Sequence, residues 1–156
     1  MTSRFPFFLC LVVLHALPGS ALADDHAGTR VPLLTIYKQE CGSCHTPFPP
    51  GMLPATSWQR VMNNLGQHYG TDASLDEVTA KQIGTWLAAN AGTYKRVREA
   101  PPQDRITKSA WFVRKHDEVP PRAWTSATVK TPANCGACHP KAAEGAFNEH
   151  DVRIPR

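Results

Sequence analysis

The chain has 156 residues and a net charge of +4, with five cysteines and seven histidines. Its modest basic surplus is not interleaved with aromatic residues, so we expect no binding to nucleic acid. Beyond the first 23 residues, no apolar run is long enough to cross a membrane as a helix.

The first 23 residues have the pattern of a signal peptide. Arg4 supplies a short positive start, residues 5–17 are mostly apolar, and Ala21-Leu22-Ala23 ends in the small residues that signal peptidase cuts. We therefore expect cleavage after Ala23, a mature chain with no integral membrane span, and localisation in the periplasm. An uncleaved anchor is the alternative, but two prolines and a histidine interrupt the apolar run.

The first part of the mature chain is predicted to form three helices. Pro32 favours the start of a helix that leads into a cysteine motif, and Ser57 begins the second helix. The third is the clearest, because Ser74 and Glu77 form a capping-box pattern and Asn90 is a stop signal. The apolar residues at helical spacing in the three segments are Leu33, Leu34, Tyr37 and Cys41; Trp58, Val61, Met62, Leu65 and Tyr69; and Leu75, Val78, Ile83, Trp86 and Leu87.

A connection near residue 100 divides the mature chain. Pro101 and Pro102 cannot continue a helix, so we place one domain at residues 24–100 and a second at residues 101–156. The second has many prolines and few periodic stretches, which predicts short helices and loops and no sheet of any size. The fold class expected for the whole chain is all-α.

The cysteines form two motifs of the same pattern. Removal of the signal peptide leaves four cysteines, and each C-x-x-C pair is followed at once by histidine, as Cys41-Gly42-Ser43-Cys44-His45 and Cys135-Gly136-Ala137-Cys138-His139. C-x-x-C-H is the attachment motif of c-type haem. Two thiols at this spacing can bond to the two vinyl groups of one porphyrin, and the histidine that follows points towards the iron. We therefore predict two covalently bound haems, with His45 and His139 as the first axial ligands.

Three other uses of the cysteines are less favoured. Two disulfides would suit an exported chain, but they leave the two histidines unexplained. A zinc site would require the pairs to converge across about ninety residues of sequence. A thioredoxin-like redox pair requires a βαβ context that is missing here.

The residues leave alternatives for the second axial ligand of each iron. His68 is our choice for the first haem because it lies in a loop before the third helix, although a solvated histidine is an equal alternative. Met62 fits core packing better, since it lies one helical turn after Trp58. For the second haem we choose His116, which follows an apolar cluster, with His150 as its rival. His26, near the start of the mature chain, is the weakest candidate.

The mature chain resembles the bacterial dihaem cytochromes c that partner the oxygen-binding sphaeroides haem protein. The resemblance covers nearly all of it. The matching residues are Glu40 to His45, Pro49 to Pro54, Ser57-Trp58, His68-Tyr69-Gly70, Ala73-Ser74-Leu75, Arg105-Ile106-Thr107, Trp111-Phe112 with Arg114 and His116, Asn134 to His139, and Arg153-Ile154-Pro155.

The resemblance implies two histidines on each iron, with His68 at the first haem and His116 at the second. It also implies an N-terminal domain similar to class I cytochromes c and a small, irregular C-terminal haem domain. The implied partner is a small oxygen-binding monohaem cytochrome c, with a membrane b-type cytochrome as a further candidate.

The function expected from these observations is electron transfer, not catalysis. If histidines fill both axial positions, no site is left on either iron for a substrate. Residues 24–94 hold four Lys/Arg against six Asp/Glu, so −2, whereas residues 95–156 hold twelve against seven, so +5. The basic half is expected to balance haem propionates or to steer an acidic partner. A small dihaem peroxidase or oxidase with one open iron is the alternative, and a haem-based sensor is the least favoured.

Overall fold

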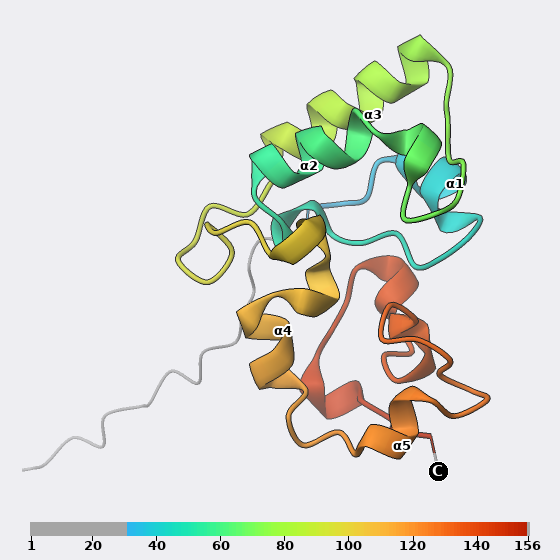
Figure 1. Ribbon diagram of the computed structural model, residues 1–156, viewed down its shortest axis with the longest axis vertical. Coiled ribbons are helices and arrows are strands. Elements are labelled where there is room, and N and C mark those ends of the chain that lie inside the picture. Colours follow the sequence, from blue (N-terminus) through green and yellow to red (C-terminus); the bar gives the residue numbers. More distant parts are fainter. Residues whose placement is uncertain (1–30, 156) are drawn as a thin grey trace, which may run out of the picture.

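A computed structural model describes residues 31–155 and shows an all-α fold, with no β-strand among these residues (Figure 1). The α-helices are α1 (Thr35–Gly42), α2 (Ala55–Met62), α3 (Glu77–Ala89), α4 (Ala110–Lys115) and α5 (Pro121–Trp124). The 3-10 turns are Pro50–Met52, Leu65–Gln67, Pro102–Asp104, Ile106–Lys108, Cys135–Ala137, Ala142–Glu144 and Glu149–Asp151. The all-α prediction is confirmed for these residues.

Two of the expectations fall outside the described residues, namely the signal peptide at residues 1–23 and the candidate ligand His26. Within residues 31–155, no helix has both the length and the apolar character needed to cross a membrane.

α1 carries the first cysteine of the first motif. The prediction that it starts at Pro32 is wrong by three residues, because Leu34 has an extended backbone with ψ 133° and the helix begins at Thr35. Leu33 and Leu34 pack instead against the core. Cys41 remains on the helix, and the rest of the motif follows its end.

α2 starts two residues earlier than predicted and is shorter. Pro54 is its N-cap, and the helix ends at Met62, so Leu65 and Tyr69 lie beyond it. Asn63 and Asn64 follow the end, and asparagine favours turns over helix interiors. Packing of Met62 in the core, as predicted, is confirmed by its position against the hydrophobic cluster.

α3 has a different cap from the one predicted. The side chain of Asp76, not Ser74, accepts the backbone N–H of Thr79 at 3.0 Å, so the helix begins at Glu77. Val78 is 77% exposed and does not belong to the buried stripe, which is made by Ile83 and Leu87. The predicted stop is confirmed, since Asn90 is the C-cap and its N–H donates to the carbonyl of Trp86.

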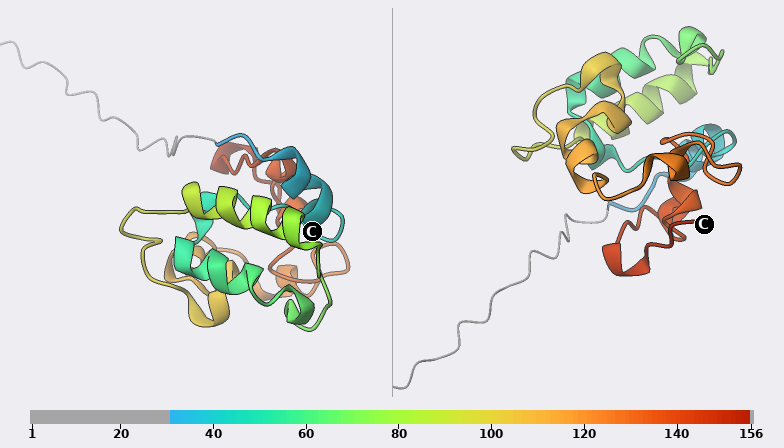
Figure 2. Two further views of the ribbon diagram at one scale, coloured as in Figure 1. Left: turned by 90° about the horizontal axis from the view of Figure 1, so that it is seen from above. Right: turned by 60° about the horizontal axis from the view of Figure 1, so that its bottom comes forward.

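One hydrophobic core holds the first half together, and Ile106 from beyond the connection packs into it. α2 and α3 lie side by side, with α1 packed beside α3 (Figures 1 and 2). The buried members of this core are Tyr37, Leu53, Trp58, Ile83, Leu87 and Ile106. Two polar groups within it are satisfied by carbonyls, because the hydroxyl of Tyr37 donates to Phe48 and the indole of Trp58 donates to Pro50.

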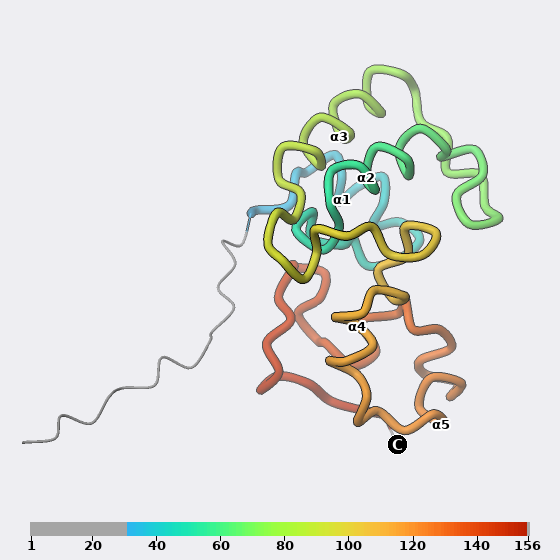
Figure 3. The backbone as a smooth tube through the Cα atoms, turned by 60° about the vertical axis from the view of Figure 1, so that its left-hand side comes forward, coloured from blue at the N-terminus to red at the C-terminus, as the bar shows by residue number. Residues whose placement is uncertain are grey.

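The second half lies against the first and has little regular structure. After α3 the chain passes through a loop and two 3-10 turns before it enters α4 (Figure 3). Ser109 is the N-cap of α4, where its hydroxyl accepts the N–H of Phe112 at 3.2 Å and donates to the carbonyl of Ile106 at 2.7 Å. This cap fixes the helix that presents Phe112 and, at its C-terminal end, His116.

Candidate haem sites

The first motif and the loop before α3 bring two histidines together. The ring centroids of His45 and His68 are 6.2 Å apart, and the ring planes differ by 16°. His45 follows the end of α1, and its ring stacks on Phe48 at 5.0 Å. His68 lies on a turn that closes when the N–H of Thr71 donates to the His68 carbonyl at 3.0 Å.

The second motif faces the end of α4. The ring centroids of His116 and His139 are also 6.2 Å apart, but their planes differ by 77°. His116 stacks on Phe112 at 4.0 Å, and His139 lies 5.2 Å from Phe147. A hollow of about 250 Å³ opens beside His116.

The shared spacing fits two imidazoles on opposite sides of one metal. An imidazole nitrogen lies about 2 Å from a bound transition metal and the ring centre roughly 1 Å further, so such a pair has centroids about 6 Å apart. Both pairs meet this condition at 6.2 Å. Direct ring stacking would bring the centroids closer, as it does for His116 on Phe112 at 4.0 Å.

Hydrogen bonds fix the protonation of one histidine in each pair. Nδ1 of His45 lies 2.7 Å from the carbonyl of Thr46, and Nδ1 of His116 lies 2.8 Å from the carbonyl of Phe112. A carbonyl oxygen only accepts, so Nδ1 carries the proton in both rings. In the neutral form of such a ring, Nε2 is the nitrogen with a free lone pair and is the one that can bind a metal.

The surroundings of the other histidine of each pair favour its neutral form. The pKa of His68 is lowered by burial and, to a smaller extent, by the neighbouring His45 and Arg105. The pKa of His139 is lowered by burial and by His116. Since only neutral imidazole binds a metal, both environments favour ligation at neutral pH.

Two buried polar atoms near the sites lack a hydrogen-bond partner among the described residues, namely Nδ1 of His139 and Nε1 of Trp111. Buried donors of this kind are normally satisfied. A haem brings two carboxylates, and a carboxylate can accept the indole N–H of Trp111. The orphaned atoms, the paired imidazoles and the thiols therefore fit haem as the group that is held.

The four motif cysteines are free thiols, two of them largely buried. All four motif cysteines are outside disulfides, and no group of three or more His, Cys, Asp or Glu side chains within residues 31–155 could hold a metal ion as zinc sites do. Burial raises the pKa of Cys41 and of Cys135 to about 11. A thioredoxin-like thiol has a lowered pKa instead.

The two motifs lie close to each other across the boundary between the halves. A Cβ atom built on Gly136, inside the second motif, would lie 3.7 Å from Oγ1 of Thr46, the residue after His45. A Cβ atom on Gly145 would lie 3.7 Å from Pro49 and 3.9 Å from Leu33. The second half is therefore packed against the loop that carries the first candidate ligand.

The rival candidates take no part in either pair. Met62 packs against the core, and its Cγ lies 3.7 Å from the position of a Cβ on Gly84 of α3. His150 lies in the 3-10 turn Glu149–Asp151, and no ring contact with His139 is found in the described part of the chain. Tyr69 and Arg105 stood among the matching residues of the sequence, but their contacts were not foreseen because they join distant segments.

A scan against protein families matches residues 37–147 to the family described as dihaem cytochrome c. A diheme cytochrome type c from Shewanella baltica OS155 is similar, with 36% identity over 80% of this chain and 95% of that chain and a TM-score of 0.70. Two structures of diheme cytochrome c from Rhodobacter sphaeroides are 42% and 38% identical, with TM-scores of 0.64 and 0.66. The match to these two covers 74% and 75% of this chain and 99% and 100% of theirs. No curated protein matches.

Proposed function

This chain belongs to the dihaem cytochrome c family, and we propose that it is an exported electron carrier in which two histidines bind each iron. As a member of the family it carries two covalently bound haem c groups, and the members are generally electron carriers. The ligand set, the periplasmic location and the partner are the parts that we add.

One observation carries the ligand proposal. Two pairs of histidines, each with one member in a C-x-x-C-H motif, have the centroid spacing of 6.2 Å that suits opposite sides of a single iron. In each pair, one Nδ1 is bonded to a carbonyl, which leaves Nε2 available. His68 and His116 were the expected partners of His45 and His139, and this spacing supports both choices.

The cysteines attach the haems and the histidines bind the irons. Cys41 and Cys44 attach the first haem between His45 and His68. The second haem is attached by Cys135 and Cys138, between His116 and His139. When bound, each haem supplies one-electron exchange at its iron. The paired imidazoles hold the iron and exclude water and substrates from it, which favours electron transfer over oxygen or peroxide chemistry.

The division into domains remains part of the proposal. We assign residues 24–100 to a domain similar to class I cytochromes c and residues 101–156 to a small, irregular haem domain. Residues 1–23 are proposed as a signal peptide for export to the periplasm. Family membership supports this location, since cytochrome c family proteins are typically exported.

A redox protein is the proposed partner, either an oxygen-binding monohaem cytochrome c or a membrane b-type cytochrome. The charge distribution supports an acidic docking face on that partner, because residues 95–156 carry twelve Lys/Arg against seven Asp/Glu. Association that slows steeply with rising salt would support this part of the proposal, and no salt dependence would contradict it.

Low-temperature EPR of the oxidised holoprotein tests the ligand set. We expect two low-spin signals of equal intensity and no high-spin signal. Nearly parallel rings act on the same iron d orbital, whereas crossed rings act on both equally, so the 16° and 77° pairs should give signals of different shape. A high-spin signal from half of the iron would favour a peroxidase or oxidase. Binding of carbon monoxide by the reduced protein at neutral pH would favour the same alternative.

Single alanine substitutions assign the signals. His68→Ala and His116→Ala should each convert one of the two irons to high spin and leave the other unchanged. His150→Ala is the matched control and should leave both signals intact. Loss of a low-spin signal in His150→Ala would show that the second iron has a different ligand from the one proposed.

A further inference from the structure

Backbone strain is concentrated beside His68. Four non-glycine residues between 31 and 155 have a positive φ, and three of them meet at one place: Tyr69 (52°), Gln103 (59°) and Asp104 (55°). A side chain makes this conformation unfavourable, and such residues persist only where their surroundings hold them. Strained residues of this kind cluster at active sites, ligand clamps and switch regions.

The turn at His68 would ordinarily not select tyrosine. Tyr69 and Gly70 are its two central residues, with φ of 52° and 97°, and turns with two positive φ values favour Asn-Gly or Gly-Gly. Gly70 obeys this preference and Tyr69 does not. The reason for tyrosine must therefore lie in what its side chain contacts.

Tyr69 contacts the segment that connects the two halves. Its hydroxyl lies 3.1 Å from the carbonyl of Gln103 and 3.1 Å from that of Asp104, so one O–H is shared between two acceptors. The guanidinium carbon of Arg105 lies 4.1 Å from the centre of the Tyr69 ring, within the range of a cation–π contact. The ring of Tyr69 also meets the His68 ring at an angle of 62°, with 4.9 Å between centroids.

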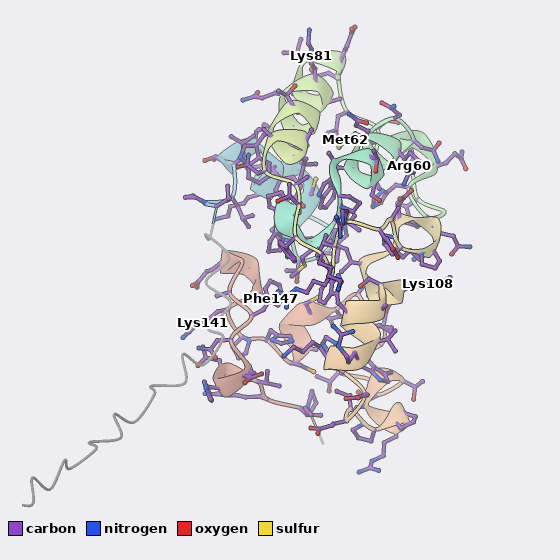
Figure 4. The ribbon with its side chains drawn as sticks, turned by 90° about the vertical axis from the view of Figure 1, so that its left-hand side faces the viewer. Arg60, Met62, Lys81, Lys108, Lys141 and Phe147 are labelled. Atoms are coloured by element: carbon purple, nitrogen blue, oxygen red, sulfur yellow. The ribbon has the colours of Figure 1, made fainter. Side chains whose placement is uncertain are left out.

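α2 anchors the segment that contains Gln103 and Asp104. Arg60 makes a bidentate contact with Asp104, from Nε to Oδ2 at 2.9 Å and from Nη2 to Oδ1 at 2.6 Å. Figure 4 shows Arg60 and Lys108 on the same side of the molecule, where Nζ of Lys108 also donates to the Gln103 side chain at 2.6 Å. Gln103 and Asp104 have a positive φ, and their carbonyls accept the Tyr69 hydroxyl. The side chain of each is thus bonded to a charged side chain.

His68 depends on this arrangement because its own ring is not tied down. His45 and His116 are each fixed by a carbonyl at Nδ1, but neither nitrogen of His68 bonds to any of residues 31–155. The direction of its ring is set by its turn and by Tyr69. We propose that Tyr69 is a positioning residue which, with Arg60, Asp104 and Arg105, holds His68 towards the iron of the first haem.

This inference rests on the proposed function, since it takes His68 as a ligand. The four residues, which we call the Tyr69 clamp, make release of His68 from the iron less frequent. Loosening the clamp should leave the ligand identity unchanged and raise the rate at which a small external ligand replaces His68. The connection between the halves therefore takes part in keeping the first site closed.

The test uses cyanide with the oxidised holoprotein. With cyanide in excess, uptake at the first iron is limited by release of His68, and the EPR signal of the near-parallel pair reports that iron. Tyr69→Phe removes the shared hydroxyl bond, and we expect uptake about threefold to tenfold faster, the change that loss of one hydrogen bond produces. Arg60→Gln, which releases Asp104, should act in the same direction.

Tyr94→Phe is the matched control. Tyr94 is 44% exposed against 43% for Tyr69, donates to a carbonyl (Gly51, 2.8 Å) and has an arginine over its ring at 5.0 Å. It contacts none of the four histidines in the two pairs. Uptake by Tyr94→Phe should equal that of the wild type, so a gain in this variant would show general loosening and overturn the proposal.

Two further outcomes separate the clamp from the function on which it rests. If His68→Ala takes up cyanide much faster than the wild type but Tyr69→Phe and Arg60→Gln take it up at the wild-type rate, only the clamp proposal fails. If His68→Ala and the wild type behave alike, His68 is not a ligand and both proposals fail. Mass spectrometry and the visible spectrum first establish that every variant carries two haems and is folded.

Discussion

The two histidine pairs share a spacing but are built on very different supports. The first is backed by three α-helices of at least eight residues and a core of six buried side chains. The second is held by two α-helices of six and four residues, 3-10 turns and loops. The centroid distance is 6.2 Å in both, whereas the ring angle is 16° in one and 77° in the other. Spacing is therefore common to both sites, and ring direction follows from the local scaffold.

Loss of the second haem should give the largest difference in hydrogen-exchange protection between the two halves. We expect Cys135→Ser/Cys138→Ser to carry one haem by mass and to lose all hydrogen-exchange protection in residues 109–155, because this half has few large buried side chains of its own. The first half should stay protected.

The converse variant, Cys41→Ser/Cys44→Ser, is the comparison for this experiment. Protection of residues 109–155 in the variant without the second haem would show that this half folds without its cofactor, and the contrast drawn between the two supports would be wrong.

Core substitutions should also cost more in the first half. Ile83 is completely buried, and Ile83→Ala should lower the free energy of unfolding by about 2–5 kcal/mol. Val129 is the buried counterpart in the second half, and Val129→Ala removes fewer carbons, so we expect about 1–3 kcal/mol. Denaturant titration of each holoprotein measures both, and a larger loss for Val129→Ala would reverse the comparison.

The cap of α4 should have a smaller effect that is specific to the second site. Ser109→Ala removes the acceptor for the N–H of Phe112, which should cost about 1 kcal/mol. Ser126 makes the same two kinds of bond, to Ala123 and from Val129, but caps no α-helix. We expect a broadened EPR signal for the crossed pair in Ser109→Ala alone, and a change in Ser126→Ala as well would argue against a role of the cap.

The smallest expected effect is on how the stability of the protein falls at acid pH. The hydrogen bonds from Arg60 hold the pKa of Asp104 below its ordinary value. A depressed folded-state pKa contributes stability above about pH 4 that is lost as the pH falls through the folded pKa. Asp104→Asn should therefore flatten the acid side of a stability–pH curve slightly. An unchanged slope would show that solvent screens this exposed pair.

The sequence was sufficient where a short motif determines the chemistry. The two C-x-x-C-H motifs predicted two haem c groups, and family membership confirms this cofactor. Asn90 marked the end of α3 correctly, because a C-cap depends on nearby residues only. His68 and His116 were chosen from local pattern and resemblance; the structure brings each beside a motif histidine, and their binding to iron stays a prediction.

Features that depend on distant residues were not predictable. Ser74 and Asp76 are both suitable caps, and only the path of the chain into α3 selects Asp76. α2 ended at Met62 although its apolar pattern continued to Tyr69, because Tyr69 is used in contacts with Gln103 and Asp104 more than thirty residues away. A pattern of hydrophobic residues contains no sign of a left-handed backbone at such positions.

The close approach of Gly136 to Thr46 bears on how the molecule would survive a cut in its chain. Because the second motif packs directly on the loop after His45, and Gly145 packs near Pro49 and Leu33, the proline-rich link is not the only connection between the halves. Proteolytic cleavage near Pro101-Pro102 should leave two fragments that stay associated and elute from a size-exclusion column in one peak with haem absorbance.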